Sequence, residues 1–240
     1  MSQATYVLVH GAFHGGWCWR PVAAGLRKRG HEVFTPTQTG LGERRHLMSS
    51  LITMETFVQD ILATIEMEEL SEVILVGHSF GGRVIAGVAD RIPEKIRHLV
   101  FIDGGLPLDG LSRLETMSPD QRDERIARAR VTGGISVPAP SASTFGVSDA
   151  DCAAWLDGHL TPQPLSAEAS RLVLSNPVGN SLPVTYVRCT APSFPGVDSS
   201  ARYAQGRDGW KYIEVEAGHN VIVTDPQWTI ELLHGVASVD

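Results

Sequence analysis

The residue in this chain most suited to take part in a reaction is a serine in a glycine-rich turn. It lies in the segment Gly77-His78-Ser79-Phe80-Gly81, which follows an apolar run at residues 73–76 and precedes a stretch of small, apolar residues. A strand, a tight turn and a helix in this order form a nucleophile elbow, in which small neighbours let a strained turn expose the serine hydroxyl. The pattern predicts a nucleophilic Ser79, and the alternative is a glycine-rich turn with an incidental serine.

A serine hydroxyl is a weak nucleophile unless a neighbouring base removes its proton. Of the nine histidines, His219 alone lies in a loop directly after a late predicted strand, at residues 212–215. A base at this place in the chain is typical of the architecture that presents such a serine. We therefore expect His219 to be the base. We interpret His78, beside the serine, as a packed core histidine.

Attack on a carbonyl group also requires donors for the negative charge that develops on its oxygen. We expect one donor to be the amide of Phe80, the residue after the serine. The second should come from the loop after the first strand, at residues 9–16, where Gly11 permits a tight turn and Ala12 is best placed to present its amide. That loop has neither a dinucleotide-binding glycine pattern nor a phosphate-binding lysine, which disfavours nucleotide binding.

The elements that must position these residues alternate between strand and helix. Short β-rich runs lie at residues 6–10, 31–35, 73–76 and 99–102, and helical patterns lie between them at 21–29, 54–69 and 80–91. Strands resume at residues 184–188 and 212–215, before a last helix at 226–236. This alternation predicts an α/β fold with a mostly parallel, doubly wound sheet and helices on both faces.

A long segment without strong strand signals, at about residues 106–182, interrupts this alternation of strands and helices. Its helical stretches, at residues 120–130, 149–156 and 167–174, predict a helical cap inserted into a single domain that spans residues 1–240. The substrate pocket beneath such a cap should be apolar, and we expect Phe13, Phe80, Trp17 and Trp155 to line it. The two tryptophans would also suit packing within the core or the cap.

The composition disfavours several other classes of function. A chain of 240 residues with 42% hydrophobic and 20% charged residues suits one globular domain. Its net charge of −7 argues against nucleic acid or an anionic membrane as the main partner. No apolar run is long enough to span a bilayer and no signal segment is visible, so we expect a cytoplasmic protein. Three widely spaced cysteines argue against a disulfide framework or a zinc site.

Three segments resemble those of the α/β-hydrolases. They are residues 10–19 (HGAFHGGWCW), 77–82 (GHSFGG) and 217–219 (AGH), and they match the branch of plant methylesterases, hydroxynitrile lyases and small bacterial esterases. The resemblance covers nearly the whole chain apart from the cap. Residues 35–44 are similar to bacterial members that include hydrolases of aryl carbamates. The resemblance implies the α/β-hydrolase fold, a Ser–His–acid triad, no metal and no organic cofactor.

Two departures from the family pattern bear on the chemistry. The hydroxynitrile lyases have threonine where this chain has Gly11, and a lysine where it has Asn220, so cyanide-releasing chemistry is disfavoured. Plant members carry their acid after the strand that matches residues 184–188, where this chain has no carboxylate. Some relatives, the haloalkane dehalogenases among them, place it after the strand that matches residues 99–102. We therefore expect Asp103 to orient His219, with Asp198 as the alternative acid.

Together these residues predict a serine hydrolase that cleaves a small, largely apolar carboxylic ester through an acyl-enzyme on Ser79. A carbamate or amide hydrolase with the same triad is the nearest alternative. Two further hypotheses are a slow-turnover ligand-binding receptor and a cofactor-free oxygenase, in which His219 is the base and Ser79 only binds. The expected partner is a small ester or carbamate molecule, and a homodimer would suit the family.

Overall fold

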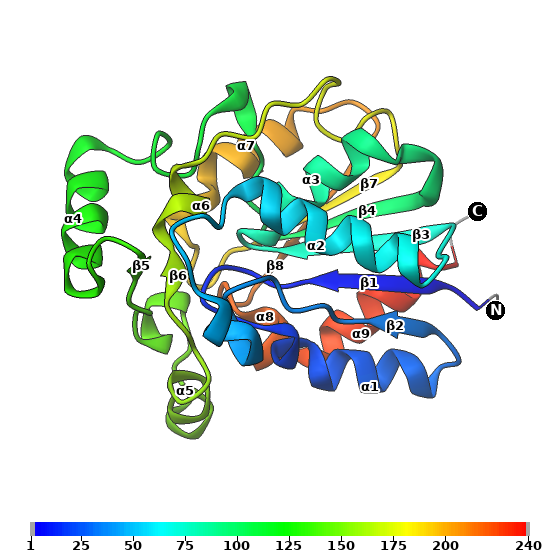
Figure 1. The fold of residues 1–240 in the computed structure, drawn as a ribbon. Helices are drawn as coiled ribbons and strands as arrows, with labels where there is room; N and C mark the ends of the chain where they lie inside the picture. Colours follow the sequence, from blue (N-terminus) through cyan, green and yellow to red (C-terminus); the bar gives the residue numbers. More distant parts are fainter. Residues whose placement is uncertain (1–2, 239–240) are drawn as a thin grey trace.

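Six parallel strands form the central sheet in the computed structural model, which describes residues 3–238 (Figure 1). They are β1 (Thr5–Val9), β2 (Glu32–Phe34), β3 (Val73–His78), β4 (Ile96–Ile102), β7 (Val184–Cys189) and β8 (Trp210–Val215). Their order in space is β2-β1-β3-β4-β7-β8. The predicted α/β fold with a parallel, doubly wound sheet is confirmed. Residues 1–2 and 239–240 of the predicted domain lie outside the described residues.

Helices cover both faces of this sheet. One face packs against α2 (Met54–Met67), α3 (Gly81–Arg91) and α7 (Asp198–Gln205), and the other against α1 (Arg20–Lys28), α8 (Val221–Thr224) and α9 (Pro226–Val236). Successive side chains of a strand point to opposite faces, so Val73 and Leu75 of β3 join the first core and Ile74 and Val76 the second. Because both faces are buried, the central strands are continuous apolar runs.

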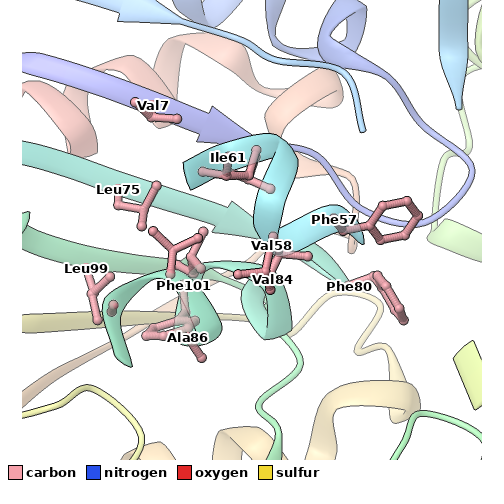
Figure 2. Packing of buried hydrophobic residues seen from close by; sticks show 14 of the residues in the cluster. Val7, Phe57, Val58, Ile61, Leu75, Phe80, Val84, Ala86, Leu99 and Phe101 are labelled. Carbon is pink, nitrogen blue, oxygen red and sulfur yellow. The ribbon is translucent and has the colours of Figure 1, made fainter. Parts of the chain in front are cut away.

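The first of these cores lies directly behind the serine turn. Figure 2 shows Leu75, Leu99 and Phe101 of the sheet packed among Phe57, Val58 and Ile61 of α2 and Val84 and Ala86 of α3. Phe80 belongs to the same core, and its ring lies edge-on to that of Phe57, with 6.2 Å between the centroids. The turn that carries Ser79 therefore rests on a close-packed apolar layer.

The segment between β4 and β7 lies over the carboxyl ends of the strands as far as residue 169, away from the two termini, and then returns along α3 to the start of β7 (Figure 1). It contains α4 (Pro119–Ala129), α5 (Ala150–Asp157) and α6 (Leu165–Ala169), and also β5 (Ser136–Val137) and β6 (Gln163–Pro164), which pair antiparallel. These two-residue strands are too short for an alternating pattern, and sequence reasoning missed them. The helix expected at residues 167–174 is wrong in extent, because Ser170 is extended and its hydroxyl accepts a hydrogen bond from the amide of Met54.

Short 3-10 helices connect the larger elements. They are Gly16–Trp19, Gly42–Leu47, Pro93–Lys95, Leu108–Gly110, Arg130–Thr132, Ala142–Phe145 and Pro195–Val197. Most lie in segments that the sequence analysis treated as loops, because a single turn is too short for a helical periodicity to show. Outside the cap, each predicted strand and helix is present, although β4 begins at Ile96 rather than at residue 99.

Two buried histidines hold the loop after β1 in place. His10 donates from Nδ1 to the carbonyl oxygen of Gly11 (2.9 Å) and accepts at Nε2 from the amide of Gln38 (3.0 Å). His14 donates from Nδ1 to the carbonyl two residues before it (2.7 Å) and accepts at Nε2 from the side-chain amide of Asn220 (3.3 Å). Burial lowers the pKa of His10 to about 3 and that of His14 to about 4, so both rings are neutral.

Acid should therefore destabilise the fold, because only the unfolded chain gains protons at these sites. Between the ordinary histidine pKa of 6.5 and the folded value of about 3, the unfolded state binds a proton at His10 and the folded state does not. The stability that the neutral histidines provide is fully present above pH 6.5 and is lost as the pH falls. At pH 5, His10 alone should have lowered the free energy of unfolding by about 2 kcal/mol. Urea denaturation at pH 7.5 and pH 5.0 measures the loss. The difference should be smaller in His10→Gln, and an unchanged difference would contradict the assignment.

Gly81 lies where α3 approaches the end of β1, two residues after Ser79. A Cβ atom there would lie 2.7 Å from the carbonyl oxygens of both Val9 and His10, so a side chain must push the backbone apart. We expect Gly81→Ala to lower the free energy of unfolding by about 1–3 kcal/mol in urea denaturation. The matched control is Gly235→Ala in α9, where a Cβ would meet no atom within 4 Å. It should raise stability by about 0.5–1 kcal/mol, and equal effects of the two changes would refute the steric argument.

Candidate active site

Ser79 occupies a sharp turn between β3 and α3. Its φ of +53° lies in the left-handed region, which is unfavourable for a residue with a side chain. Hydrogen bonds hold the turn in this conformation: the amide of Ser79 donates to Ile102 (3.2 Å), and its carbonyl accepts from the amides of Gly82 (3.1 Å) and Gly105 (2.8 Å). The turn places the serine side chain at the carboxyl edge of the sheet, in a cavity beneath the cap.

A hydrogen-bonded chain of three side chains begins at this serine. His219, in the loop after β8, has its Nε2 2.8 Å from Ser79 Oγ and its Nδ1 2.6 Å from Asp103 Oδ2. Both His219 and Asp103 are buried. With Nδ1–H donating to the carboxylate, Nε2 is left to accept the proton of the serine hydroxyl. The structure therefore brings together three residues from three separate segments of the chain.

Asp103, and not Asp198, is the carboxylate beside the histidine. The second carboxylate oxygen of Asp103 accepts from Arg188 Nη1 (3.1 Å) and from the amide of Cys189 (3.1 Å). Asp198 lies on the outer side of Arg188, forms an ion pair with its Nη2 and is partly exposed. Sequence reasoning missed Arg188, whose only signal was a charged residue inside an otherwise apolar strand.

His78 and Phe194 fix the position of His219 from two sides. His78 donates from Nε2 to the backbone carbonyl of His219 (2.8 Å), and burial lowers the pKa of His78 well below its ordinary value, so its ring is neutral. The core position predicted for His78 is correct. Phe194 stacks on the imidazole of His219, with 4.1 Å between the ring centroids. No sequence signal marked Phe194, which reaches the site because the loop after β7 folds back.

The loop after β1 lies directly against the serine. A Cβ atom on Gly11 would lie 2.8 Å from Ser79 Cβ, so this approach requires glycine. Ala12 and Phe80 border the same cavity, and within the described part of the chain neither backbone amide donates to a protein acceptor. The next amide, that of Phe13, donates to Gln163 Oε1 of the cap (3.1 Å). Two unused amide donors therefore lie beside the serine.

The cavity at Ser79 has a volume of about 70 Å³ and a mixed lining. Its aromatic side chains are those of Phe13, Phe80, Phe145 and Phe194. Its charged side chains are those of Arg83, Arg113, Arg125 and Glu168.

Trp17 and Trp155, which we expected in the pocket, lie elsewhere. Their rings contact each other edge to face, with 5.4 Å between the centroids, and Trp17 borders a separate surface hollow beside α1. Trp17 also stacks behind His14. Both tryptophans thus pack the loop after β1 against the cap, since α5 carries Trp155 to the outside of that loop.

Three observations concern metals, membranes and thiols. Among residues 3–238, no three His, Cys, Asp or Glu side chains are arranged to hold a metal ion. No helix in this range is both long and apolar enough to cross a membrane. Cys18, Cys152 and Cys189 are unpaired thiols.

Comparison with known proteins agrees with this geometry. The family model described as "Alpha/beta hydrolase family" matches residues 6–232. The "Carbendazim hydrolyzing esterase" of Nocardioides sp. (strain SG-4G) is 41% identical over 246 aligned positions, which cover 96% of this chain and 98% of that protein. The "Putative methylesterase 14, chloroplastic" of Arabidopsis thaliana is 34% identical over 116 residues, 48% of this chain and 33% of that protein.

A solved structure extends the likeness to three dimensions. An extracellular alpha/beta-hydrolase from a Paenibacillus species, described as sharing structural and functional homology with tobacco Salicylic Acid Binding Protein 2, superposes with a TM-score of 0.83. It is 26% identical, and the alignment covers 97% of this chain and 98% of that one. A family match over most of the chain, a relative similar over nearly its full length and a shared fold lead to one conclusion: the chain belongs to the alpha/beta hydrolase family.

Proposed function

We propose that this chain is a serine hydrolase that cleaves a small carboxylic ester through an acyl-enzyme on Ser79. The observation that carries the proposal is the hydrogen-bonded chain from Ser79 through His219 to the buried Asp103. This arrangement gives the serine a base and gives the base a fixed orientation. The aromatic lining of the cavity supports a largely apolar substrate.

In the first half of the reaction, Ser79 Oγ attacks the ester carbonyl carbon while His219 Nε2 takes its proton. The amides of Ala12 and Phe80 donate to the carbonyl oxygen as it becomes negative. The C–O bond then breaks, and His219 returns the proton to the departing alcohol. Asp103 stabilises the imidazolium that forms between these two steps.

In the second half, water attacks the acyl group on Ser79. His219 removes a proton from this water and then passes it to Ser79 Oγ as the acyl–oxygen bond breaks. The products are the carboxylic acid and the regenerated serine. The stacking of Phe194 on His219 leaves the edge of the imidazole, with its Nε2, directed at the serine.

Carbamate hydrolysis is the second candidate. Its support is the relative that is 41% identical over nearly the full chain and is described as a carbendazim hydrolyzing esterase, since carbendazim is itself a carbamate. The same steps on a carbamate would place a carbamoyl group on Ser79. Cyanide-releasing lyase chemistry has less support, because Asn220 is buried and bonded to His14 where the lyases carry a lysine.

We also propose a cytoplasmic location and a small ester or carbamate molecule as the main partner. The three unpaired cysteines support a reducing compartment. The net charge of −7 supports the expectation that neither nucleic acid nor an anionic membrane is a partner. A homodimer remains a proposal that rests on the family resemblance, and sedimentation measurements would test it.

The first test compares wild type with Ser79→Ala on p-nitrophenyl acetate, p-nitrophenyl butyrate and an aryl methylcarbamate. We expect many turnovers in wild type and none above background in the variant, because Ser79 Oγ is the hydroxyl bonded to His219 within residues 3–238. The ratio of ester to carbamate turnover identifies the preferred class. A single burst without turnover would favour a ligand-binding receptor. A rate that depends on dissolved oxygen rather than on Ser79 would favour an oxygenase.

The second test compares Asp103→Asn with Asp198→Asn. Loss of the Asp103 carboxylate removes the acceptor that orients His219 and stabilises its charged form, so kcat should fall by about 10⁴-fold, as in serine proteases. Asp198→Asn removes only a partly exposed partner of Arg188, and kcat should stay within about tenfold of wild type. A larger loss in Asp198→Asn than in Asp103→Asn would show that Asp198 is the acid.

A further inference from the structure

The cavity beside Ser79 carries an uneven charge. Three arginines line it, Arg83, Arg113 and Arg125, with a single carboxylate, Glu168. Arg125 binds this carboxylate with two parallel hydrogen bonds, from Nε (2.8 Å) and from Nη2 (2.5 Å), so the pair is neutral as a unit. Neither Arg83 nor Arg113 forms an ion pair with any carboxylate among residues 3–238. Two guanidinium groups without an ion-pair partner among the described residues thus border the cavity, and the carboxylate of Glu168 acts on the charge of Arg113 only from beyond ion-pair distance.

Arg83 is the more deeply placed of the two. It lies in the first turn of α3, four residues after the serine, and is only 3% exposed. Its Nη1 donates to the carbonyl of Leu111 (2.8 Å), whereas its Nε finds no acceptor in the described part of the chain. Burial, together with the nearby charge of Arg113, lowers the pKa of Arg83 to about 10, so it is charged at neutral pH. A buried cation with an unused donor is unfavourable until a ligand supplies an acceptor.

Arg113 borders the same cavity from the cap side. Its Nη1 donates to Thr116 Oγ1 (3.1 Å), and its Nη2 lies next to Gly196, where a Cβ atom would be 3.1 Å from it. Arg113 lies near enough to Arg83 for the two positive charges to repel each other, which adds to the effect of burial in lowering the pKa of Arg83. An anion held between the two guanidinium groups would remove this repulsion and satisfy their free donors.

We propose that Arg83 and Arg113 form an anion-binding subsite, which selects substrates that carry a carboxylate in addition to the scissile ester or carbamate. This inference rests on the proposed function and specifies its substrate class. The planar guanidinium group matches a carboxylate with two parallel hydrogen bonds. The apolar body of the substrate would lie against Phe13, Phe80 and Phe145, which share the cavity.

Two matched substrate pairs test the subsite. p-Nitrophenyl hemisuccinate and p-nitrophenyl butyrate differ by a carboxylate at the end of the acyl group. 4-Acetoxybenzoate and its methyl ester differ by a carboxylate on the leaving group. In wild type, kcat/KM for the anionic member should exceed that for the neutral member by about tenfold or more in at least one pair. Arg83→Met and Arg113→Met should each lower this anionic-to-neutral ratio by about 10- to 100-fold.

The control is Arg130→Gln, which removes one positive charge from an exposed position of the cap outside the cavity lining. It should leave the ratio unchanged. The inference is overturned if wild type shows no preference for the anionic member of either pair, or if the arginine variants slow both members equally. Arg113→Met provides the answer if Arg83→Met does not fold. Hydrolysis of all four esters by Ser79→Ala would instead refute the proposed function itself.

Discussion

The buried carboxylate of Asp103 is the interaction on which the site and its surroundings depend. A carboxylate that is buried away from water strongly destabilises the folded state unless charged or polar donors surround it. Asp103 follows β4 and meets the imidazole of His219 from the loop after β8, and the guanidinium of Arg188 and the amide of Cys189 from β7. Three neighbouring strands are thereby linked at their carboxyl ends. Any shift in their register would leave the charge unpaired, so sheet geometry and site geometry stabilise each other.

The strained serine turn relies on the same edge of the sheet. Ser79 and Asp103 both have positive φ angles, and the amide of Ser79 donates to Ile102, directly before Asp103. Such conformations persist only where surrounding contacts over-determine them. Here the contacts are the apolar layer beneath Phe80 and the close backbone packing at Gly81. The core of the fold therefore stabilises the strained backbone conformation that presents the Ser79 hydroxyl.

The cap and the loop after β1 determine what can reach the serine. Gln163 of the cap binds the amide of Phe13, and Thr161 donates from its amide to the carbonyl of Phe13 (2.9 Å). Phe145 of the cap closes over His219, with 6.0 Å between the ring centroids. Because a connecting segment can change without disturbing the sheet, selectivity among relatives is expected to reside here. Arg113 is part of this segment, whereas Arg83 belongs to α3.

The amino-acid sequence by itself determined the architecture and two of the three linked residues. The apolar runs of β3 and β4, the glycines around Ser79 and the late loop with His219 are local patterns, and local patterns record strand, turn and helix directly. Asp103 was expected beside His219 only on the family resemblance, and Asp198 stayed open as the alternative until the tertiary structure placed Asp103 there. Both are loop carboxylates, and only the register of β4 and β7 puts one of them against His219 and turns the other outward on Arg188.

The lining of the cavity was also decided by tertiary structure. Trp17 and Trp155 are large aromatic residues of the kind expected in an apolar pocket. The cap folds so that they pack against each other outside the cavity at Ser79. Arg83 and Arg113 are charged, which is not expected of residues that line an apolar pocket, yet α3 and the cap place them at the same cavity as Ser79. Which side chains line a cavity depends on contacts between segments that are far apart in the chain. Residue type and periodicity report only on near neighbours, and so they cannot specify such a lining.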